Sequence, residues 1–175
     1  WTPETLTLAD ISEGMLQDAA ARLDDSYRLD TVLADAMALP FDDASFDDVV
    51  AMHMLYHTSD PAQALSEICR VLKPGGRAIV TTVGDDDLKA LCDLSRDAFG
   101  SSGSDLLFPV FGARRAAPLV AAQFDTVTHA VCRDTFRIDD TAAAVDYITS
   151  FPPGEAAAPE QIERFKTRFE SMRRA

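Results

Sequence analysis

The stretch LTLADISEGML, residues 6–16, leads from a predicted strand into a predicted helix through a single acid. Its first four residues form an apolar, β-branched run that ends at Asp10. From Ile11 onward, apolar residues recur at the spacing of one helix face, and Ser12 stands at the position of an N-cap. The stretch therefore brings a carboxylate to the carboxyl end of a strand, the edge at which open α/β sheets bind ligands.

The same pattern of a strand followed by an acid recurs further along the chain. A short predicted strand over residues 31–34 stops at Asp35. After a turn-rich segment, residues 46–54 form a nearly unbroken apolar run, which is typical of a strand covered on both faces.

A helix with well-marked ends follows. Asp60 precedes Pro61 at the first helical position, and Gln63 is placed to complete a capping-box-like pattern. The segment Lys73-Pro74-Gly75-Gly76 ends the helix, and residues 77–83 are predicted to form another buried strand. Strand–helix–strand units of this length predict an α/β fold with a parallel sheet and right-handed crossovers.

The second half of the chain has a mixed pattern. Residues 124–133 alternate enough to predict a strand, which carries His129 and pairs with residues 135–138 as an antiparallel hairpin. Aromatic residues are frequent here and suit either a core or an apolar substrate pocket. Helices are predicted over residues 85–99, 113–122, 140–150 and 159–174.

Composition limits the functional classes. The 175 residues suit one domain, and a formal charge of −13, from 16 Lys and Arg against 29 Asp and Glu, disfavours nucleic acid as a partner. The three cysteines are widely spaced and predict neither a disulfide framework nor a zinc site. No run approaches the roughly 18 apolar residues of a membrane span. We expect a cytoplasmic protein without membrane contact.

Asp10 taken alone has two interpretations. A carboxylate at the end of the second strand of a nucleotide-binding fold accepts hydrogen bonds from ribose hydroxyls. An acid after a strand is, however, more often a charge at a helix N-terminus. Asp35 lies about one βα unit further on and favours the first interpretation, because a carboxylate and the next backbone N–H can read an adenine edge.

Three motifs, in this order, carry a resemblance to a known family: LTLADISEGML over residues 6–16, DAMALPFDDASFD over residues 35–47 and RVLKPGG over residues 70–76. In these motifs the chain resembles the class I S-adenosylmethionine-dependent methyltransferases, specifically the small-molecule group that includes the quinone-biosynthesis C-methyltransferases. The resemblance covers roughly residues 5–83. It implies a Rossmann-like α/β fold, a mostly parallel sheet with helices on both faces, and S-adenosyl-L-methionine as the cofactor.

The resemblance also implies roles for individual residues. Asp10 would bind the ribose, Ile11 and Met15 would pack against the adenine, and Asp35 with Ala36 would read the adenine amino group. His53 would line the methionine moiety, and Leu55, Tyr56 and His57 would face the site of transfer. The implied cofactor-binding set is Asp10, Ile11, Met15, Asp35, Ala36, Met37 and His53.

The chain departs from the family at its start. Family members place a glycine-rich loop after the first strand, about 20 residues before the ribose acid. Here nine residues precede Asp10, and none is glycine. In the family strand order 3-2-1-4-5, the first strand lies between those ending at Asp10 and His53, so its absence leaves two strand pairs beside a gap. Each buried backbone group left unpaired there would cost about 1–3 kcal/mol.

Either the first strand and its loop lie outside these 175 residues, or something else fills their place. We expect the first, and hence a single, N-terminally incomplete domain. Residues 1–84 would form its cofactor-binding half and residues 85–175 its substrate-side half.

Methyl transfer from a sulfonium needs alignment and exclusion of water, and proximity alone can supply about 7–11 kcal/mol. His57 is the candidate general base, because imidazole titrates near neutral pH and the residue follows a strand at the ligand-binding rim. Tyr56 is a candidate for orienting the substrate. Alternatively, His57 hydrogen-bonds the helix start, and His53 is a wall residue. Three consecutive acids, Asp85 to Asp87, are expected to be a solvated helix start, with no metal site.

We expect S-adenosylmethionine-dependent methyl transfer to a small molecule, with a homodimer left open. A catalytically inactive methyltransferase-like binding or interaction module is the alternative from another class. A dehydrogenase with the related dinucleotide fold is a rival enzyme, but the Lys73-Pro74-Gly75-Gly76 segment and the motif at Asp35 do not belong to its pattern.

Overall fold

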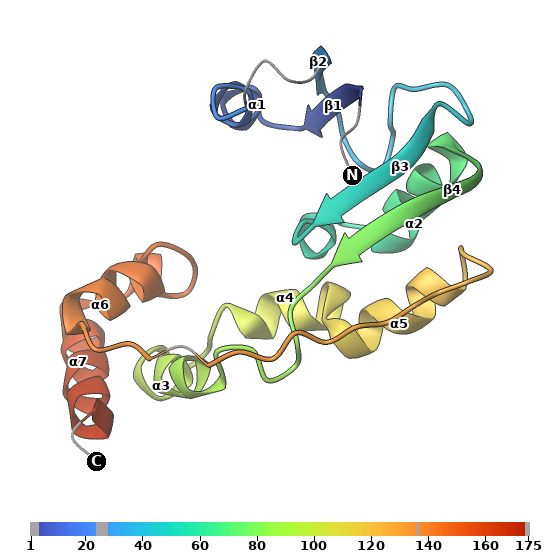
Figure 1. Cartoon of the computed structure of the whole chain (residues 1–175). Helices are drawn as coiled ribbons and strands as arrows, with labels where there is room; N and C mark the ends of the chain where they lie inside the picture. Colours follow the sequence, from blue (N-terminus) through green and yellow to red (C-terminus); the bar gives the residue numbers. More distant parts are fainter. Residues whose placement is uncertain (1–3, 24–27, 136, 174–175) are drawn as a thin grey trace. The chain divides into compact units, whose positions relative to one another are not determined.

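The computed structural model describes residues 4–23, 28–135 and 137–173, and they fall into two compact units (Figure 1). Among the described residues, the strands β1 to β4 all belong to unit 1, and the regular structure of unit 2 is helical. Unit 1 comprises Trp1–Thr81 and Pro118–Asp125, and unit 2 comprises Thr82–Ala117 and Thr126–Ala175.

The first strand pair of unit 1 forms around the opening motif. Strand β1 (Thr5–Asp10) is followed by helix α1 (Glu13–Ala20) and strand β2 (Arg28–Leu33), and the two strands pair in parallel. As predicted, Ser12 is the N-cap of α1, since its side chain accepts a hydrogen bond from the backbone N–H of Met15 at 3.3 Å. Strand β2 begins at Arg28, before the predicted start at residue 31, and Arg28 pairs with Thr5, the first residue of β1.

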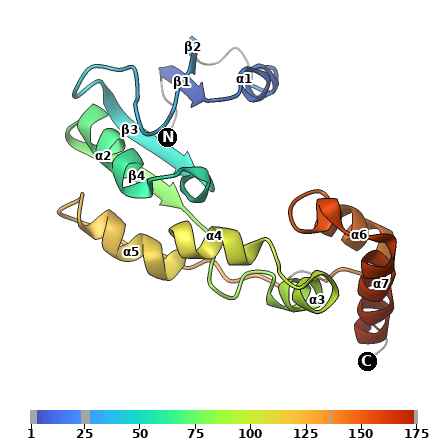
Figure 2. The ribbon, with the colours of Figure 1, turned by 180° about the vertical axis from the view of Figure 1, so that it is seen from behind.

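The second strand pair is covered by a helix. Strand β3 (Phe46–Met52) pairs in parallel with β4 (Leu72–Thr81), and α2 (Pro61–Val71) lies along one face of the pair in both views (Figures 1 and 2). Asp60 caps α2 as predicted, since its side chain accepts hydrogen bonds from the backbone N–H groups of Ala62 and Gln63. The side chain of Gln63 does not complete a capping box. It donates instead to the backbone carbonyl of Met37 at 3.3 Å.

The Lys73-Pro74-Gly75-Gly76 segment ends α2, as predicted, but lies inside β4 as an irregularity. Phe46 pairs with Leu72, whereas Asp48 pairs with Arg77, so the register shifts between these pairs. Gly75 has φ of 81°, in the region that favours glycine. A Cβ on Gly76 would lie 2.9 Å from the carbonyl oxygen of Asp47. The two glycines thus accommodate the additional residues of β4 that lie between Leu72 and Arg77.

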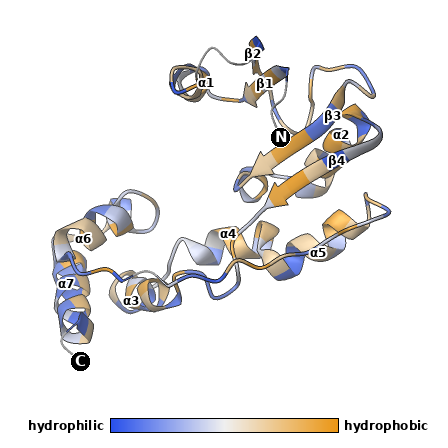
Figure 3. Ribbon diagram, viewed as in Figure 1, coloured by the Kyte–Doolittle hydropathy of each residue, from blue (hydrophilic) through white to orange (hydrophobic). Residues whose placement is uncertain are grey.

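The four strands form two separate two-stranded sheets, β1–β2 and β3–β4, instead of one continuous mostly parallel sheet. This matches the two pairs expected in the absence of the first family strand. Both strands of the β3–β4 pair contain apolar residues, drawn in orange in Figure 3. Three of these side chains, Val50, Met52 and Ile79, are 44%, 63% and 54% exposed. Within unit 1, α2 packs against this pair, and these three side chains are exposed.

Unit 2 is built on a helical core. Its helices are α3 (Lys89–Phe99), α4 (Ser104–Phe111), α5 (Ala113–Ala121, whose end belongs to unit 1), α6 (Thr141–Thr149) and α7 (Pro159–Arg173). Phe165 is fully buried and stacks against Phe99 and Phe169, with ring centroids 5.8 Å and 6.1 Å apart. The buried cluster is Leu91, Leu94, Ala98, Ala144, Ile148, Phe165 and Phe169.

Two predictions for unit 2 are wrong. The antiparallel hairpin over residues 124–138 is absent from the described part of that range, which contains no strand, and His129 lies in irregular chain. Alternation alone cannot make a strand without a partner, and Val127 and Val131 are 46% and 61% exposed. Phe136 lies outside the described residues. Helix α3 begins at Lys89 and not at Asp85, the predicted start, and the three acids lie before it in a turn.

Candidate functional site

Asp10 and Asp35 lie at the same edge of the β1–β2 pair. Asp10 is the last residue of β1 and pairs with Leu33, the last residue of β2. The backbone N–H of Ala34 donates to the carbonyl of Asp10 at 2.9 Å, and Asp35 is the next residue. The two carboxylates predicted to bind one nucleoside therefore follow the carboxyl ends of adjacent parallel strands.

Both carboxylates are held by the same local hydrogen bond. One oxygen, Oδ1, of Asp10 accepts from the backbone N–H of Ser12 at 2.8 Å, and Oδ1 of Asp35 accepts from that of Met37 at 2.8 Å. Such turns orient an aspartate side chain relative to its own backbone. Within the described residues no donor reaches Oδ2 of either side chain. One oxygen of each carboxylate thus fixes its orientation and leaves the other for a ligand.

Apolar side chains lie beside Asp10 in the chain and in space. Ile11 is 75% exposed and Met15, in the first turn of α1, is 60% exposed. Large apolar side chains this exposed gain free energy when a flat apolar group covers them. Ala36 and Met37, beside Asp35, are half-buried. The surroundings suit the base of a nucleoside, although the structure does not test the individual roles predicted for these residues.

The loop that carries Asp35 is fastened to α2 through residues that sequence reasoning missed. Glu67 accepts a hydrogen bond from the backbone N–H of Leu39 at 2.8 Å. Arg70 donates to the carbonyls of Leu39 and Phe41, at 2.9 Å and 2.8 Å. The signal in the sequence was a Glu–Arg pair at i, i+3 on a helix, at positions that become half-buried.

Glu67 and Arg70 also bind each other. Two nitrogens of the guanidinium donate to the two carboxylate oxygens, each at 2.8 Å. The hydrogen bond from Arg70 is the main reason why the pKa of Glu67 lies below its usual range, although partial burial opposes the shift. Hydrogen bonds to Glu67 and then to Asp43 raise the pKa of Arg70 above its ordinary value. Both groups are therefore charged at neutral pH.

His53 directly follows β3 with its backbone in an unusual conformation. Its φ is 50°, a region that residues with a Cβ rarely adopt. Its backbone N–H donates to the carbonyl and to Oγ1 of Thr81, at 3.2 Å and 3.1 Å. The side chain is exposed at the end of the strand. Its predicted place beside the methionine moiety stays a prediction.

Tyr56 and His57 lie in the 3₁₀ turn η1 (Leu55–His57) and form an aromatic row with His53. The ring of Tyr56 is 4.6 Å from that of His57 and 6.4 Å from that of His53, centroid to centroid. His57 is exposed, and its imidazole has no hydrogen bond within the described residues. Asp60, not His57, caps the helix start. An exposed imidazole is available for proton transfer, but its catalytic role stays a prediction.

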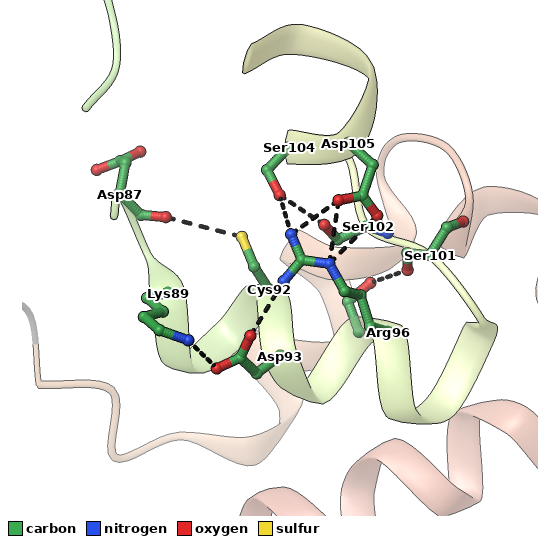
Figure 4. A network of polar contacts seen from close by, with 10 residues as sticks. Asp87, Lys89, Cys92, Asp93, Arg96, Ser101, Ser102, Ser104 and Asp105 are labelled. Atoms are coloured by element: carbon green, nitrogen blue, oxygen red, sulfur yellow. Dashed lines mark hydrogen bonds and ion pairs between the residues drawn. The ribbon is translucent and has the colours of Figure 1, made fainter. Parts of the chain in front are cut away.

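Two hollows of the structure lie in unit 2. A shallow one of about 530 Å³ is lined by Asp85, Ser104, Asp105, Phe108, Pro109, Arg114 and Arg115. Arg96 connects the helices beside it, since its guanidinium donates to Asp105 at 2.8 Å, to Ser104 at 3.0 Å and to Asp93 at 3.0 Å (Figure 4). None of the residues predicted to bind the cofactor lines this hollow. In the part of the chain that the structure describes, no helix is long and apolar enough to cross a membrane.

Comparison with protein families identifies the segment that carries both carboxylates. Residues 2–80 match the family model described as "Methyltransferase domain". This segment is similar to the methyltransferase domain family. The family implies S-adenosylmethionine as the cofactor. The paired strand ends and the exposed apolar side chains described above suit an adenosine.

Curated relatives extend the methyltransferase match. The chain is 49% identical over 72 residues to a demethylmenaquinone methyltransferase of Clavibacter sepedonicus, covering 41% of this chain and 29% of that protein. It is 38% identical over 94 residues to a ubiquinone/menaquinone biosynthesis C-methyltransferase of Ruegeria, covering 50% and 38%. The chain thus spans about a third of the length of these relatives.

Comparison with solved structures shows a likeness in fold over more of the chain. The crystal structure of the [4+2]-cyclase SpnF aligns with 97% of this chain and 62% of its own, with a TM-score of 0.54 and 23% identity. At this identity the likeness shows the α/β fold alone. The name of that protein also shows that the fold does not fix the reaction.

Proposed function

We propose that the chain binds S-adenosylmethionine through Asp10 and Asp35 and supports transfer of its methyl group to a small molecule. The observation that carries this proposal is the placement of the two carboxylates at adjacent strand ends. Each has one oxygen oriented by its own backbone and, among the residues that the structure describes, one without a donor. The match of residues 2–80 to the methyltransferase domain family supports the choice of cofactor.

The cofactor would be held by residues of unit 1. Asp10 would accept hydrogen bonds from ribose hydroxyls, charge-assisted bonds that are shorter and stronger than neutral ones. Ile11 and Met15 would cover one face of the adenine. Asp35, with the backbone at Ala36, would bind the edge that carries the amino group. The remaining members of the proposed set, Met37 and His53, would contact the base and the methionine portion.

The bound cofactor supplies an electrophilic methyl group on a sulfonium. The residues of this chain would align an acceptor atom with that group and exclude water, a contribution of about 7–11 kcal/mol to such reactions. His57 would accept a proton at an imidazole nitrogen where the acceptor carries one, and Tyr56 would orient the substrate. The relatives named as demethylmenaquinone methyltransferases support a small-molecule acceptor.

Binding of S-adenosylhomocysteine, measured by isothermal titration calorimetry, tests the proposal. Asp10→Asn and Asp35→Asn each remove a charge-assisted acceptor, so each should weaken binding about tenfold or more. Asp30→Asn is the matched control, because Asp30 is an exposed acid on β2 away from the strand end, and it should bind normally.

The complete product of the gene that encodes this chain should be titrated beside the 175-residue chain. If neither binds the probe, or if the Asp10 and Asp35 variants bind as well as the control, the proposal fails. The first of these results would favour the non-catalytic interaction module.

A further inference from the structure

One face of α2 holds the loop that carries Asp35, which is called the Asp35 loop below and comprises residues 35–43. Gln63, Glu67 and Arg70 occupy positions i, i+4 and i+7 of the helix, so they lie on one face. Their side chains bind successive backbone groups of the loop in the same chain direction. Gln63 binds the carbonyl of Met37, Glu67 the N–H of Leu39, and Arg70 the carbonyls of Leu39 and Phe41.

These four contacts reach backbone atoms of the loop, and Arg70 also binds the side chain of Asp43. The backbone contacts therefore fix the path of the loop. The loop is closed at its other end by Asp35 itself, whose Oδ1 accepts from the N–H of Met37 and whose carbonyl accepts from the N–H of Ala38 at 3.0 Å. Asp35 is thus connected to α2 through two short hydrogen-bonded steps.

The guanidinium of Arg70 donates hydrogen bonds to several groups at once. Nε and Nη2 bind the carboxylate of Glu67, Nη2 also binds Leu39, and Nη1 binds both Phe41 and Asp43. A lysine ammonium, which is a compact point charge on a flexible stem, cannot reproduce this planar arrangement. The side chain is 31% exposed and that of Glu67 is 14% exposed, so water competes little for the carboxylate.

We propose that Glu67 and Arg70 are positioning residues which, by anchoring the Asp35 loop on α2, set how strictly the site distinguishes the amino group of adenine from the oxo group of hypoxanthine. This inference rests on the proposed binding of S-adenosylmethionine. A hydrogen-bond acceptor discriminates only when it is held in place, because a mobile carboxylate can turn away from a base that offers no donor.

The test compares two probes, S-adenosylhomocysteine and its deaminated analogue S-inosylhomocysteine, which differ in the 6-substituent of the base and in the hydrogen that hypoxanthine carries on N1. The wild-type chain should bind the adenosyl probe about tenfold or more tightly, since the oxo group offers Asp35 no donor at the 6-position and the N1–H offers no acceptor to the backbone at Ala36. Arg70→Gln should bring the ratio of the two dissociation constants close to one, mainly by weakening the adenosyl probe. Arg70→Lys should not restore the ratio, and Glu67→Gln, which keeps an acceptor for Leu39, should give an intermediate value.

Arg77→Gln is the matched control. Arg77 forms a comparable ion pair with Asp48 at 2.7 Å, on the β3–β4 pair and away from the loop. It should keep the wild-type ratio. The ratio is informative because a general loss of stability lowers the affinity for both probes equally. Circular dichroism verifies that each variant folds, and Glu67→Gln provides the answer if Arg70→Gln does not fold.

The outcomes separate the two hypotheses. If the wild-type chain and the complete gene product bind neither probe, the proposed function fails and the positioning role fails with it. If the wild-type chain discriminates but Arg70→Gln and Glu67→Gln discriminate equally well, the proposed function stands and the positioning role is overturned.

Discussion

Two arginines on two helices form networks that look alike but connect different parts of the chain. Arg70 on α2 binds Asp43, Phe41 and Leu39, which lie 27, 29 and 31 positions away in the sequence. Arg96 on α3 binds Asp93, Ser104 and Asp105, which lie within nine positions (Figure 4). The first network joins a loop to a distant helix, and the second joins a helix to the one that follows it.

This difference shows that the same side chain can serve two purposes. The Arg96 network closes a short loop, so it can form as soon as α3 and α4 fold. The Arg70 network depends on unit 1 as a whole, because it holds a segment that has no regular structure of its own. Local networks therefore stabilise elements, whereas the long-range one positions a loop.

The largest expected effect is on the core of unit 2, and it tests whether the two units are separate. Phe165→Ala removes a fully buried ring and should lower the free energy of unfolding of unit 2 by about 3–5 kcal/mol. In hydrogen exchange read by mass spectrometry, α3, α6 and α7 should lose protection while β3 and β4 keep theirs. Met172→Ala, at a site 54% exposed on the same helix, is the control. Equal loss of protection in both units would contradict their independence.

A smaller effect is expected from a steric change in unit 2. A Cβ at Gly154 would lie 1.9 Å from the carbonyl oxygen of Ile148, so the backbone must move. Gly154→Ala should lower the free energy of unfolding by about 1–3 kcal/mol, measured by urea denaturation. Gly84→Ala is the control, because a Cβ there meets nothing within 4 Å. A similar loss in both variants would argue against a clash at Gly154.

The two arginine networks can be opened one at a time. Arg70→Gln should speed hydrogen exchange of the Leu39 amide about tenfold and leave the Ser102 amide unchanged. Arg96→Gln should do the reverse, because the N–H of Ser102 donates to Asp105, which Arg96 orients. Nuclear magnetic resonance resolves the two amides. Cross-effects of equal size would show that the networks are coupled.

The smallest effect is expected from pH between 5 and 8. Hydrogen bonds from Arg70 and Arg96 hold the pKa of Glu67 and of Asp105 below their usual ranges. A carboxylate with a depressed pKa contributes stability above its unfolded pKa of about 4 and loses it as pH falls through the lower folded value. The Leu39 and Ser102 amide shifts should therefore stay constant from pH 8 to 5 and move only below about pH 4. A transition near neutral pH would contradict both ion pairs.

Much of unit 1 could be predicted from the sequence because its signals are local. The N-caps at Ser12 and Asp60, the glycines after α2 and the apolar run of β3 all act within a few residues, and the structure confirms them. The same local signals gave the edge at which Asp10 and Asp35 lie.

What could not be predicted depends on distant partners. The hairpin was wrong because alternation does not supply a neighbouring strand, and α4 was missed because Pro109 lies inside it. The hydrogen bonds of Glu67 and Arg70 to the loop were missed because they too depend on partners distant in the sequence. The Glu–Arg pair at i, i+3 is visible in the sequence, but its backbone partners lie about 30 positions upstream, and the pair itself does not show which segment it binds.

The positive φ of His53 limits which substitutions the site can accept. A non-glycine residue in this region costs about 1–2 kcal/mol, and a β-branched side chain costs more. A saturation library at this position, sorted for soluble expression alone, should be enriched in glycine and asparagine and depleted of valine and isoleucine. Sorting the same library for ligand binding would show whether the imidazole is worth the strained backbone that carries it.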